Sequence, residues 1–321
     1  MPENPRKTIV IALGGNSLIG AKEKGTIEEQ YANLKQTTEQ LIDLLTSENR
    51  IVITHGNGPQ VGSLLLATEV AKDVVPPLPL DICGAATQGT MGYMIQQTLA
   101  NGLRARNIIH NITTVITQVI VDRNDPAFDH PSKPIGPFYS FEEAQKIQKE
   151  KGWVMFEDAK RGYRRVVPSP KPVNIQQARI IKSMLDADEI VVSVGGGGIP
   201  VVRENDRRLT GVEAVIDKDY ASSQLAVDIN ADVLLILTAV EKVYRDFHLP
   251  TQQALGHITL DEAKKLMAEG HFGKGSMEPK VGAAIEFLQE SDKDKDVEVI
   301  ITLSATATAA LKHEAGTRIT R

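Results

Sequence analysis

The sequence predicts an α/β fold, a three-layer αβα sandwich with a mostly parallel central sheet and an inserted flap subdomain. Short continuous apolar runs such as Ile190 to Val194 are typical of strands that are buried on both faces. These runs alternate with amphipathic helical segments, as in successive βαβ units. Between about residues 122 and 172, clustered prolines interrupt the alternation. We therefore expect a flap, residues 122–172, inserted into the sandwich.

The composition is that of an ordinary globular protein and argues against several classes. Of the 321 residues, 41% are hydrophobic and 24% are charged. The formal net charge of −5 disfavours nucleic acid as a partner, so any anion site must be local. The first apolar run, Thr8 to Leu13, is too short for a signal peptide core or a membrane span, and Cys83 is the single cysteine. We expect a cytoplasmic protein with no membrane partner and no cysteine-built metal site.

The first half of the chain is expected to alternate strands and helices. Thr26 and Glu29 have the spacing of a capping box at a helix start, and Pro59 fits the first position of another helix. The segment 113–121 is rich in Val, Ile and Thr, which favours a strand. The predicted strands are 8–13, 51–54 and 113–121, and the predicted helices are about 26–45, 59–71 and 81–101.

The flap interrupts this order, and the second half resumes it. Within the flap we expect a short helix near 142–149 and a hairpin of 153–157 and 163–167 that turns through 158–162. After Asn174, helices and strands alternate again. The predicted helices there are one that ends at about 185 and three at 217–230, 259–268 and 279–289, and the predicted strands are 190–194, 233–237 and 297–302.

Four glycine-bearing segments are expected at the carboxyl edge of the sheet, where open α/β folds bind ligands. They follow Leu13, Thr54 and Val194 and precede Met277. Backbone N–H groups without a nearby Cβ can approach anionic oxygens, so this pattern favours a phosphate site. Each segment alone is also compatible with a plain turn. The segment after Thr54 is not a dinucleotide fingerprint, because Val61 replaces the third glycine, and it is not a P-loop.

Three lysines are candidates for this site: two lie at expected helix starts and one lies on the flap. Lys218 and Lys280 are at expected helix N-termini, where the helix dipole disfavours a cation. Asp217 and Asp219 flank Lys218 and offset that cost. Two cations placed against local preference indicate a shared anion. Lys133 lies between two prolines in an expected loop of the flap, where a lysine is otherwise usually solvated.

The expected pocket suits a polyphosphate and a second small anion. Phosphoryl transfer spreads negative charge over equatorial oxygens, which lysines and backbone N–H groups can stabilise without a dedicated nucleophile. His55, at a strand end, could be a base or could order its loop by hydrogen bonding, and it receives no role. The seven histidines include no metal-ligand pair at helical spacing, so we expect no protein-held metal.

The ordered set of motifs resembles the carbamate kinases of the amino acid kinase superfamily over nearly the whole chain. The segments that carry the resemblance are Gly14-Gly15-Asn16, His55 to Gly62, Asp81 to Gly89, Gly195 to Pro200, Ile216 to Asp219 and Gly275 to Lys280. The resemblance implies a homodimer that interconverts ATP and carbamate with ADP and carbamoyl phosphate, using Mg²⁺. In fermenting microbes such enzymes usually run toward ATP and end the arginine deiminase route of arginine metabolism.

The resemblance also implies a single amino-acid-kinase domain, residues 1–321, with two sides. The N-terminal lobe, residues 1–190, would hold carbamoyl phosphate and carry the flap, and the C-terminal lobe, residues 191–321, would hold the nucleotide. The substrate-binding residues would be Gly14, Gly15, Asn16, Gly56, Asn57 and Gly58. The catalytic residues would be Lys133, Lys218, Asp219 and Lys280, with Asp219 fixing the lysines.

The nucleotide side is expected to use glycines for phosphates and three further residues for the adenine. The expected nucleotide-binding residues are Gly195, Gly196, Gly197, Asp217, Thr238, Tyr244 and Met277. Asp217 would belong to the water shell of the metal, and the last three would contact the adenine. Ala239 stands where many superfamily members carry Asp, so it receives no role.

Two other functions stay open at this stage. One is another small-acid kinase of the superfamily, acting on an acylated amino acid or a nucleoside monophosphate. A larger acceptor needs more room, whereas the long flap suits a small acceptor that is closed off from solvent. The other is a non-catalytic nucleotide-binding sensor. A sensor has no need for every cation of a transfer site, and Lys133, Lys218 and Lys280 are all present.

Overall fold

A computed structural model describes residues 6–15, 18–20, 23–46, 48–157 and 162–321. Its main sheet has eight strands in the order β15-β17-β16-β12-β1-β2-β9-β3. The pair β16 and β17 is antiparallel and the other neighbours are parallel, which confirms the expected mostly parallel sheet. The strands are β1 (Thr8–Leu13), β2 (Arg50–His55), β3 (Ile112–Thr114), β9 (Ile190–Val192), β12 (Val233–Leu237), β15 (His257–Thr259), β16 (Glu298–Thr302) and β17 (Thr317–Thr320).

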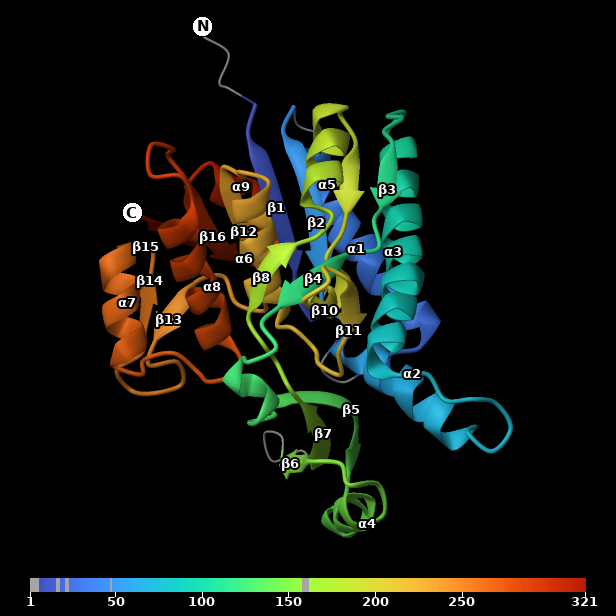
Figure 1. Cartoon of the computed structure of the whole chain (residues 1–321). Coiled ribbons are helices and arrows are strands. Elements are labelled where there is room, and N and C mark those ends of the chain that lie inside the picture. Colours follow the sequence, from blue (N-terminus) through green and yellow to red (C-terminus); the bar gives the residue numbers. More distant parts are fainter. Residues whose placement is uncertain (1–5, 16–17, 21–22, 47, 158–161) are drawn as a thin grey trace, which may run out of the picture.

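Helices cover both faces of this sheet (Figure 1). Successive residues of a strand point to opposite faces. Accordingly Val10 and Ala12 of β1 pack with one layer, whereas Ile9 and Ile11 pack with the other. The structure is therefore the predicted three-layer αβα sandwich. The first layer contains α5 (Ala178–Asp186), α6 (Lys218–Asp228), α7 (Leu260–Ala268) and α8 (Met277–Glu290), and the second contains α1 (Ile27–Leu45), α3 (Leu80–Arg104) and α9 (Ala307–Leu311).

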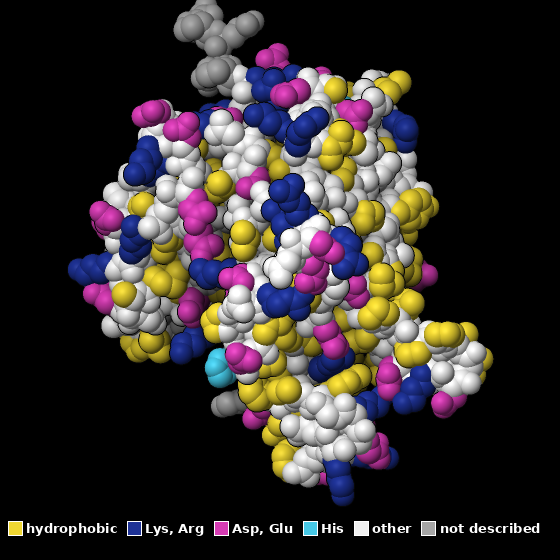
Figure 2. All heavy atoms as spheres, in the orientation of Figure 1, with side chains coloured by type: hydrophobic (Ala, Val, Ile, Leu, Met, Phe, Trp, Pro, Cys, Tyr) yellow, Lys and Arg dark blue, Asp and Glu magenta, His cyan; other side chains and the backbone are white. Residues whose placement is uncertain are grey.

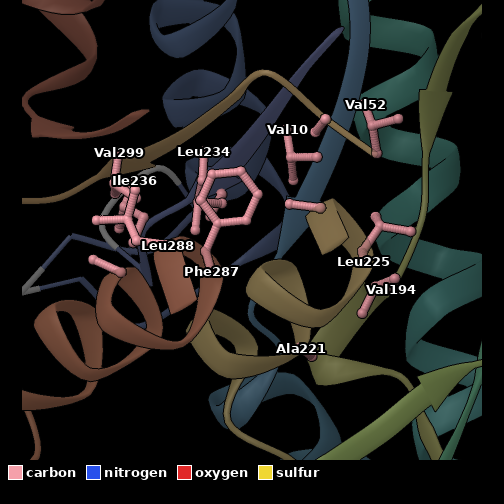
Figure 3. Close-up of a cluster of buried hydrophobic side chains, with 14 of the residues drawn as sticks. Val10, Val52, Val194, Ala221, Leu225, Leu234, Ile236, Phe287, Leu288 and Val299 are labelled. Carbon is pink, nitrogen blue, oxygen red and sulfur yellow. The ribbon is translucent and has the colours of Figure 1, made fainter. Parts of the chain in front are cut away.

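An apolar cluster fixes α6 and α8 against the main sheet (Figure 3). Phe287 of α8 is fully buried, and it shares this cluster with Leu225 of α6 and Leu234 of β12. Burial of side chains of this size contributes roughly 1.5–3 kcal/mol each. The helices are therefore held firmly along their length, and this packing sets the position of the charged residues at their N-terminal ends.

A second sheet corrects one prediction. The segment 113–121, expected to be a single strand, is divided between β3 of the main sheet and β4 of a four-stranded sheet in the order β11-β10-β4-β8. The chain changes sheets near Thr117, whose N–H donates to Oε1 of Gln88 at 2.7 Å instead of continuing the ladder. Local β propensity could not indicate this break. The strands are β4 (Gln118–Val121), β8 (Pro172–Ile175), β10 (Ile199–Arg203) and β11 (Leu209–Gly211).

The flap protrudes from the body of the molecule (Figure 1). It contains an antiparallel sheet in the order β5-β7-β6, and the pairing of β6 with β7 confirms the expected hairpin. Its expected turn, 158–162, includes residues 158–161, which lie outside the described residues. Lys133, expected in a loop, is instead the first residue of β5. The elements are β5 (Lys133–Tyr139), α4 (Phe141–Lys151), β6 (Met155–Glu157) and β7 (Tyr163–Val167).

Several helix starts agree with their sequence signals, and others shift by one or two residues. The Thr26 and Glu29 capping box is present, and Pro59 lies in the first turn of α2 (Gly58–Val70). Helix α8 begins at Met277, two residues before its expected start, so Lys280 remains in the first turn. The remaining short elements are β13 (Val243–Arg245), β14 (Gln253–Leu255), η2 (Pro126–Phe128), η3 (Gly195–Gly197) and η4 (Ser304–Thr306).

Candidate active site

Three of the four expected glycine segments, those after β1, β2 and β9, lie at the carboxyl edge of the main sheet. Gly14, after β1, lies so close to β12 that a Cβ there would be 2.6 Å from the carbonyl oxygen of Leu237. A Cβ on Gly195, after β9, would be 2.5 Å from Nε2 of His55, the last residue of β2. The ends of four neighbouring strands thus meet closely, through backbone at Gly14 and through the His55 side chain at Gly195, and neither glycine position has room for a side chain.

The glycine run after β9 has a packing role that the sequence did not indicate. A Cβ on Gly196 would overlap the side-chain amide of Asn57, and a Cβ on Gly197 would overlap the backbone carbonyl of Ile216. The N–H of Gly197 already donates to a carbonyl 3.1 Å away within the turn. Glycine is therefore required here for close approach of two site segments, and phosphate binding by Gly195, Gly196 and Gly197 stays a prediction.

Lys218 and Lys280 converge on one carboxylate, that of Asp219. The Lys218 ammonium donates to Oδ1, and the Lys280 ammonium donates to Oδ2 with 2.9 Å between Nζ and the oxygen. The Asp219 side chain is 4% exposed, and the two lysine side chains are 13% and 14% exposed. The two lysines that were expected to share an anion therefore lie together, and Asp219 joins them.

Acidic residues make these helix starts tolerable for cations. Asp217 is the N-cap of α6, and its Oδ1 accepts the N–H of Asp219 at 2.9 Å. Asp219 and Glu278 lie in the first turns of α6 and α8. Negative charge at a helix N-terminus is favourable, so the two aspartates offset the unfavourable position of Lys218 and Glu278 offsets that of Lys280.

Burial and charge pull the pKa values of this group in opposite directions. Burial raises the pKa of the Asp219 carboxyl, but the ammonium groups of Lys218 and Lys280 outweigh burial and hold that pKa well below its ordinary value. For Lys218, burial lowers the pKa, and the Asp219 carboxylate only partly restores it. Asp219 is therefore ionised at neutral pH. Its one negative charge is fewer than the two positive charges it holds, so the group attracts a further anion.

Lys218 also reaches the segment that follows β2. A Cβ on Gly56 would lie 3.2 Å from Cδ of Lys218, so the lysine side chain passes directly over this glycine. The hydroxyl oxygens of Thr54 and Ser222 lie 2.6 Å apart, and the Ser222 hydroxyl donates to the Lys218 carbonyl at 2.6 Å. The contact between Thr54 and Ser222 fixes α6 to β2, and Lys218 thereby lies beside the expected substrate segment, residues 56–58.

The expected substrate segment leads into the N-terminus of α2. Asn57 is the N-cap residue and Gly58 begins the helix. The Asn57 amide donates to Oγ1 of Thr87 at 2.8 Å and is 5% exposed, so the turn is rigidly held. N–H groups at a helix N-terminus bind anions. Gly15 borders open space, and Asn16 lies outside the described residues.

Lys133 crosses from the flap to the start of α6. Its ammonium contacts Oδ2 of Asp217 at 2.5 Å, and the side chains are 31% and 19% exposed. All four residues predicted to be catalytic therefore lie on or next to the first turn of α6. Asp217 is the partner of Lys133, a contact between residues 84 positions apart that no local pattern indicates. Its expected role on the nucleotide side stays a prediction.

Comparison with known proteins places these features in a family. A model of the amino acid kinase family matches residues 7–303. A carbamate kinase from Thermococcus kodakarensis is 51% identical over 88% of this chain and 90% of its own length. One from Pyrococcus horikoshii is 46% identical over 100% of both chains. The chain belongs to the amino acid kinase family, among its carbamate kinases.

Solved structures agree with this carbamate kinase assignment. Carbamate kinase from Giardia lamblia bound to citric acid superimposes with a TM-score of 0.92, 43% identity and coverage of 98% of this chain and 99% of that one. The same enzyme bound to AMP-PNP superimposes with a TM-score of 0.90 at 43% identity. A UMP kinase from Bacillus anthracis shares only the fold, with 14% identity and a TM-score of 0.54.

The three residues expected at the adenine lie in separate segments of the carbamate kinase fold. Thr238 directly follows β12, and its N–H donates to the carbonyl of Thr302 at 2.8 Å. Tyr244 lies in β13, with its ring 5.4 Å from that of Phe247. Met277 begins α8 and packs against the core. Their contact with an adenine stays a prediction.

Gln88 is a supporting residue that the sequence did not single out. Its amide nitrogen donates to the carbonyls of Thr117 and Gly195, each at 3.1 Å, and its oxygen accepts the N–H of Thr117 at 2.7 Å. It is 2% exposed. All of its bonds go to backbone, so it holds the glycine run in place. A buried glutamine with its amide fully used has no signature in one sequence.

Among the described residues, no group of three or more His, Cys, Asp and Glu side chains is arranged to hold a metal ion. No helix within the described ranges is both long and apolar enough to cross a bilayer. On the face drawn in Figure 2, basic and acidic side chains are interspersed.

His55 is a buried neutral base at the site. It is 1% exposed, and its Nδ1 lies 3.0 Å from the Gly56 carbonyl oxygen, which can only accept, so Nδ1 carries the proton. Burial lowers the pKa of His55 to about 4, and the charge of Lys218 contributes in the same direction. His55 therefore orders its loop as a neutral side chain and is not a proton carrier near pH 7.

This burial predicts a pH dependence of stability. The unfolded chain binds a proton at His55 near the ordinary pKa of about 6.5, whereas the folded protein does so only near 4. Folding stability should therefore be lost as pH falls from about 6.5 to about 4, by about 3 kcal/mol from this group. Urea unfolding of the parent and of His55→Gln across this range measures it. The variant should show a shallower fall, and equal slopes would contradict this account.

Proposed function

We propose that this protein catalyses reversible phosphoryl transfer between ATP and carbamate. The observation that carries the proposal is that Lys218 and Lys280 are both buried and both bonded to Asp219. This group lies next to the start of α2, and the flap residue Lys133 contacts the neighbouring Asp217. Such a group stabilises the charge of a migrating phosphoryl, which is the main demand of this reaction. The carbamate kinase relatives, which match nearly the full length, support the acceptor.

In the direction of ATP formation, the terminal phosphate oxygen of ADP attacks the phosphorus of carbamoyl phosphate. The new P–O bond forms as the bond to the carbamoyl oxygen breaks, and carbamate leaves with the electron pair. No proton needs to move, which agrees with a site whose reactive groups are ammonium ions. Lys218 and Lys280 would contact the transferring phosphoryl and the nucleotide phosphates, while Lys133 and the segment 56–58 would hold the carbamoyl side.

Magnesium would enter with the nucleotide. The two carboxylates at the centre of the site, Asp217 and Asp219, already hold lysine ammonium groups. Mg²⁺ usually binds through one or two carboxylates together with substrate phosphates. The residues therefore fit Mg²⁺ as the counter-ion of ADP or ATP, and Asp217 would hold its water shell. When bound, the ion neutralises negative charge on the phosphates.

The wider setting follows from the same assignment. We infer a cytoplasmic homodimer that makes ATP at the end of arginine fermentation by the arginine deiminase route. Exposed apolar side chains at Ile82 and Tyr93 on α3 and at Ile116 offer a surface for the second copy.

Light scattering of the purified protein should give the mass of two chains. A mass of one chain would reject the dimer. The two-lobe division near residue 190 also remains part of the proposal.

Carbamoyl phosphate, ADP and Mg²⁺ mixed with the purified protein should yield ATP. N-acetylglutamate and UMP, each supplied with ATP, should give no ADP above background, because the rival kinases need those larger acceptors. A coupled luminescence or NADH assay measures both directions. A folded protein that binds ADP but makes no ATP would support the sensor instead.

Lys280→Ala should lose turnover more than binding. The lysine stabilises charge that develops in the transition state, so we expect kcat to fall by the equivalent of about 2–4 kcal/mol, with a much smaller change in KM for ADP. Steady-state kinetics measures the split. Lys293→Ala, an exposed lysine in a solvent-facing turn, is the matched control and should behave as the parent. A rate for Lys280→Ala within a few-fold of the parent would remove Lys280 from the mechanism.

A further inference from the structure

The flap strand β5 touches helix α2 backbone to backbone. A Cβ on Gly62 of α2 would overlap the backbone nitrogen and Cα of Gly136 in β5, and it would lie 3.1 Å from the carbonyl carbon of Ile135. Gly62 is buried within the helix. Helix and flap are adjacent in Figure 1 as well. No side chain fits between them, so the contact distance depends on glycine at position 62.

The strand is shaped to make this contact. Gly136 has a φ of +74°, in the left-handed region that favours glycine, and the pairing of β5 with β7 shifts register between Ile135 and Tyr139. Such an irregularity bends a strand locally. Around it, Val61, Ile135 and Val167 form part of a small apolar cluster and are each at most 2% exposed. Apolar packing thus holds the bend of β5 against α2.

Each of these two elements begins at a part of the proposed carbamoyl side of the site. Helix α2 begins at Gly58 directly after Asn57, at the expected carbamoyl phosphate segment. Strand β5 begins at Lys133, three residues before Gly136 and so about 10 Å along the strand. The Lys133 ammonium then reaches Asp217 at 2.5 Å. The contact between Gly62 and Gly136 therefore sets where β5 begins, and with it the position of the Lys133 side chain.

We propose that Gly62 and Gly136 are positioning residues for the transfer reaction. Their backbone contact sets the distance between the anion-binding start of α2 and the Lys133 ammonium. The inference rests on the proposed function, because it assigns Lys133 to the carbamoyl side of that site. A methyl group at position 62 separates the two backbones and shifts Lys133 from its place, with the site residues themselves unchanged.

The size of the effect follows from the geometry of transfer reactions. A misplacement of about 1 Å in a catalytic group can reduce rate by about 100-fold. We therefore expect Gly62→Ala to lower kcat/KM for carbamoyl phosphate by about 10- to 100-fold. The dissociation constant for ADP should stay within about twofold, because the nucleotide side does not depend on the flap contact.

A merely structural role for Gly62 gives a different pattern. Ala is a better helix former than Gly, so a substitution that only relaxed packing would change melting temperature without a selective effect on carbamoyl phosphate. Ser63→Ala is the matched control, since it also places Ala inside α2 but at an exposed position one residue away. It should match the parent in kinetics, with at most the small rise in melting temperature that the helix propensity of Ala provides.

A double-mutant cycle with Lys133→Ala tests whether Gly62 acts through the lysine. If it does, Gly62→Ala should cost little further activity once Lys133 is absent, so that the double variant is within about threefold of Lys133→Ala. Fully additive losses would overturn the proposal. If Gly62→Ala does not fold, Gly136→Ala takes its place in the cycle. Its Cβ would lie 3.7 Å from Cα of Gly62, which is an ordinary contact, but the positive φ at this position would strain the bend of β5.

Hydrogen exchange gives a readout that does not need catalysis. In the unliganded protein, Gly62→Ala should speed amide exchange in β5 and β7 and leave the main sheet unchanged, whereas Ser63→Ala should leave both unchanged. Unaltered exchange in the flap would overturn the proposal even if the parent turned over carbamoyl phosphate. If the parent protein is inactive but the variants show the expected exchange pattern, the proposed function is rejected, whereas the role of Gly62 in holding the flap against α2 is supported.

Discussion

The structure depends on one constraint, which is that two buried ammonium groups must be held close together. Asp219 meets it by offering one carboxylate oxygen to each of Lys218 and Lys280. Two ammonium groups that share one carboxylate repel each other, and burial adds a desolvation cost for each of them. An ionised carboxylate between them makes the arrangement stable. It also leaves a net positive charge that a phosphoryl group can neutralise.

The rest of the fold brings partners to this carboxylate from distant parts of the chain. The apolar cluster around Phe287 fixes α6 and α8, whose first turns supply the lysines. The bond between Thr54 and Ser222 ties α6 to β2 and thereby to the substrate segment. Gln88 holds the glycine run in the space between these elements. The flap reaches the site from outside the sandwich, through the contact of Lys133 with Asp217.

The sequence predicted the elements whose signals are local. Buried apolar runs predicted the parallel sheet, and the cations at helix starts predicted that Lys218 and Lys280 share a site. The sequence could not predict contacts between segments with no common pattern, such as Lys133 with Asp217 or Gly62 with Gly136. It also missed the break between β3 and β4, because a side-chain bond to Gln88, not β propensity, ends the first strand. The roles of Thr238, Tyr244 and Met277 depend on a bound nucleotide and stay predictions.

The most direct test is a crystal structure with ADP, Mg²⁺ and a planar metal fluoride in place of the transferring phosphoryl. The account predicts that Nζ of Lys218 and Nζ of Lys280 both lie within about 3 Å of fluoride or phosphate oxygen atoms while Asp219 still joins them. If either ammonium points away from the fluoride, or if Asp219 releases both lysines to bind the metal, the central claim is contradicted.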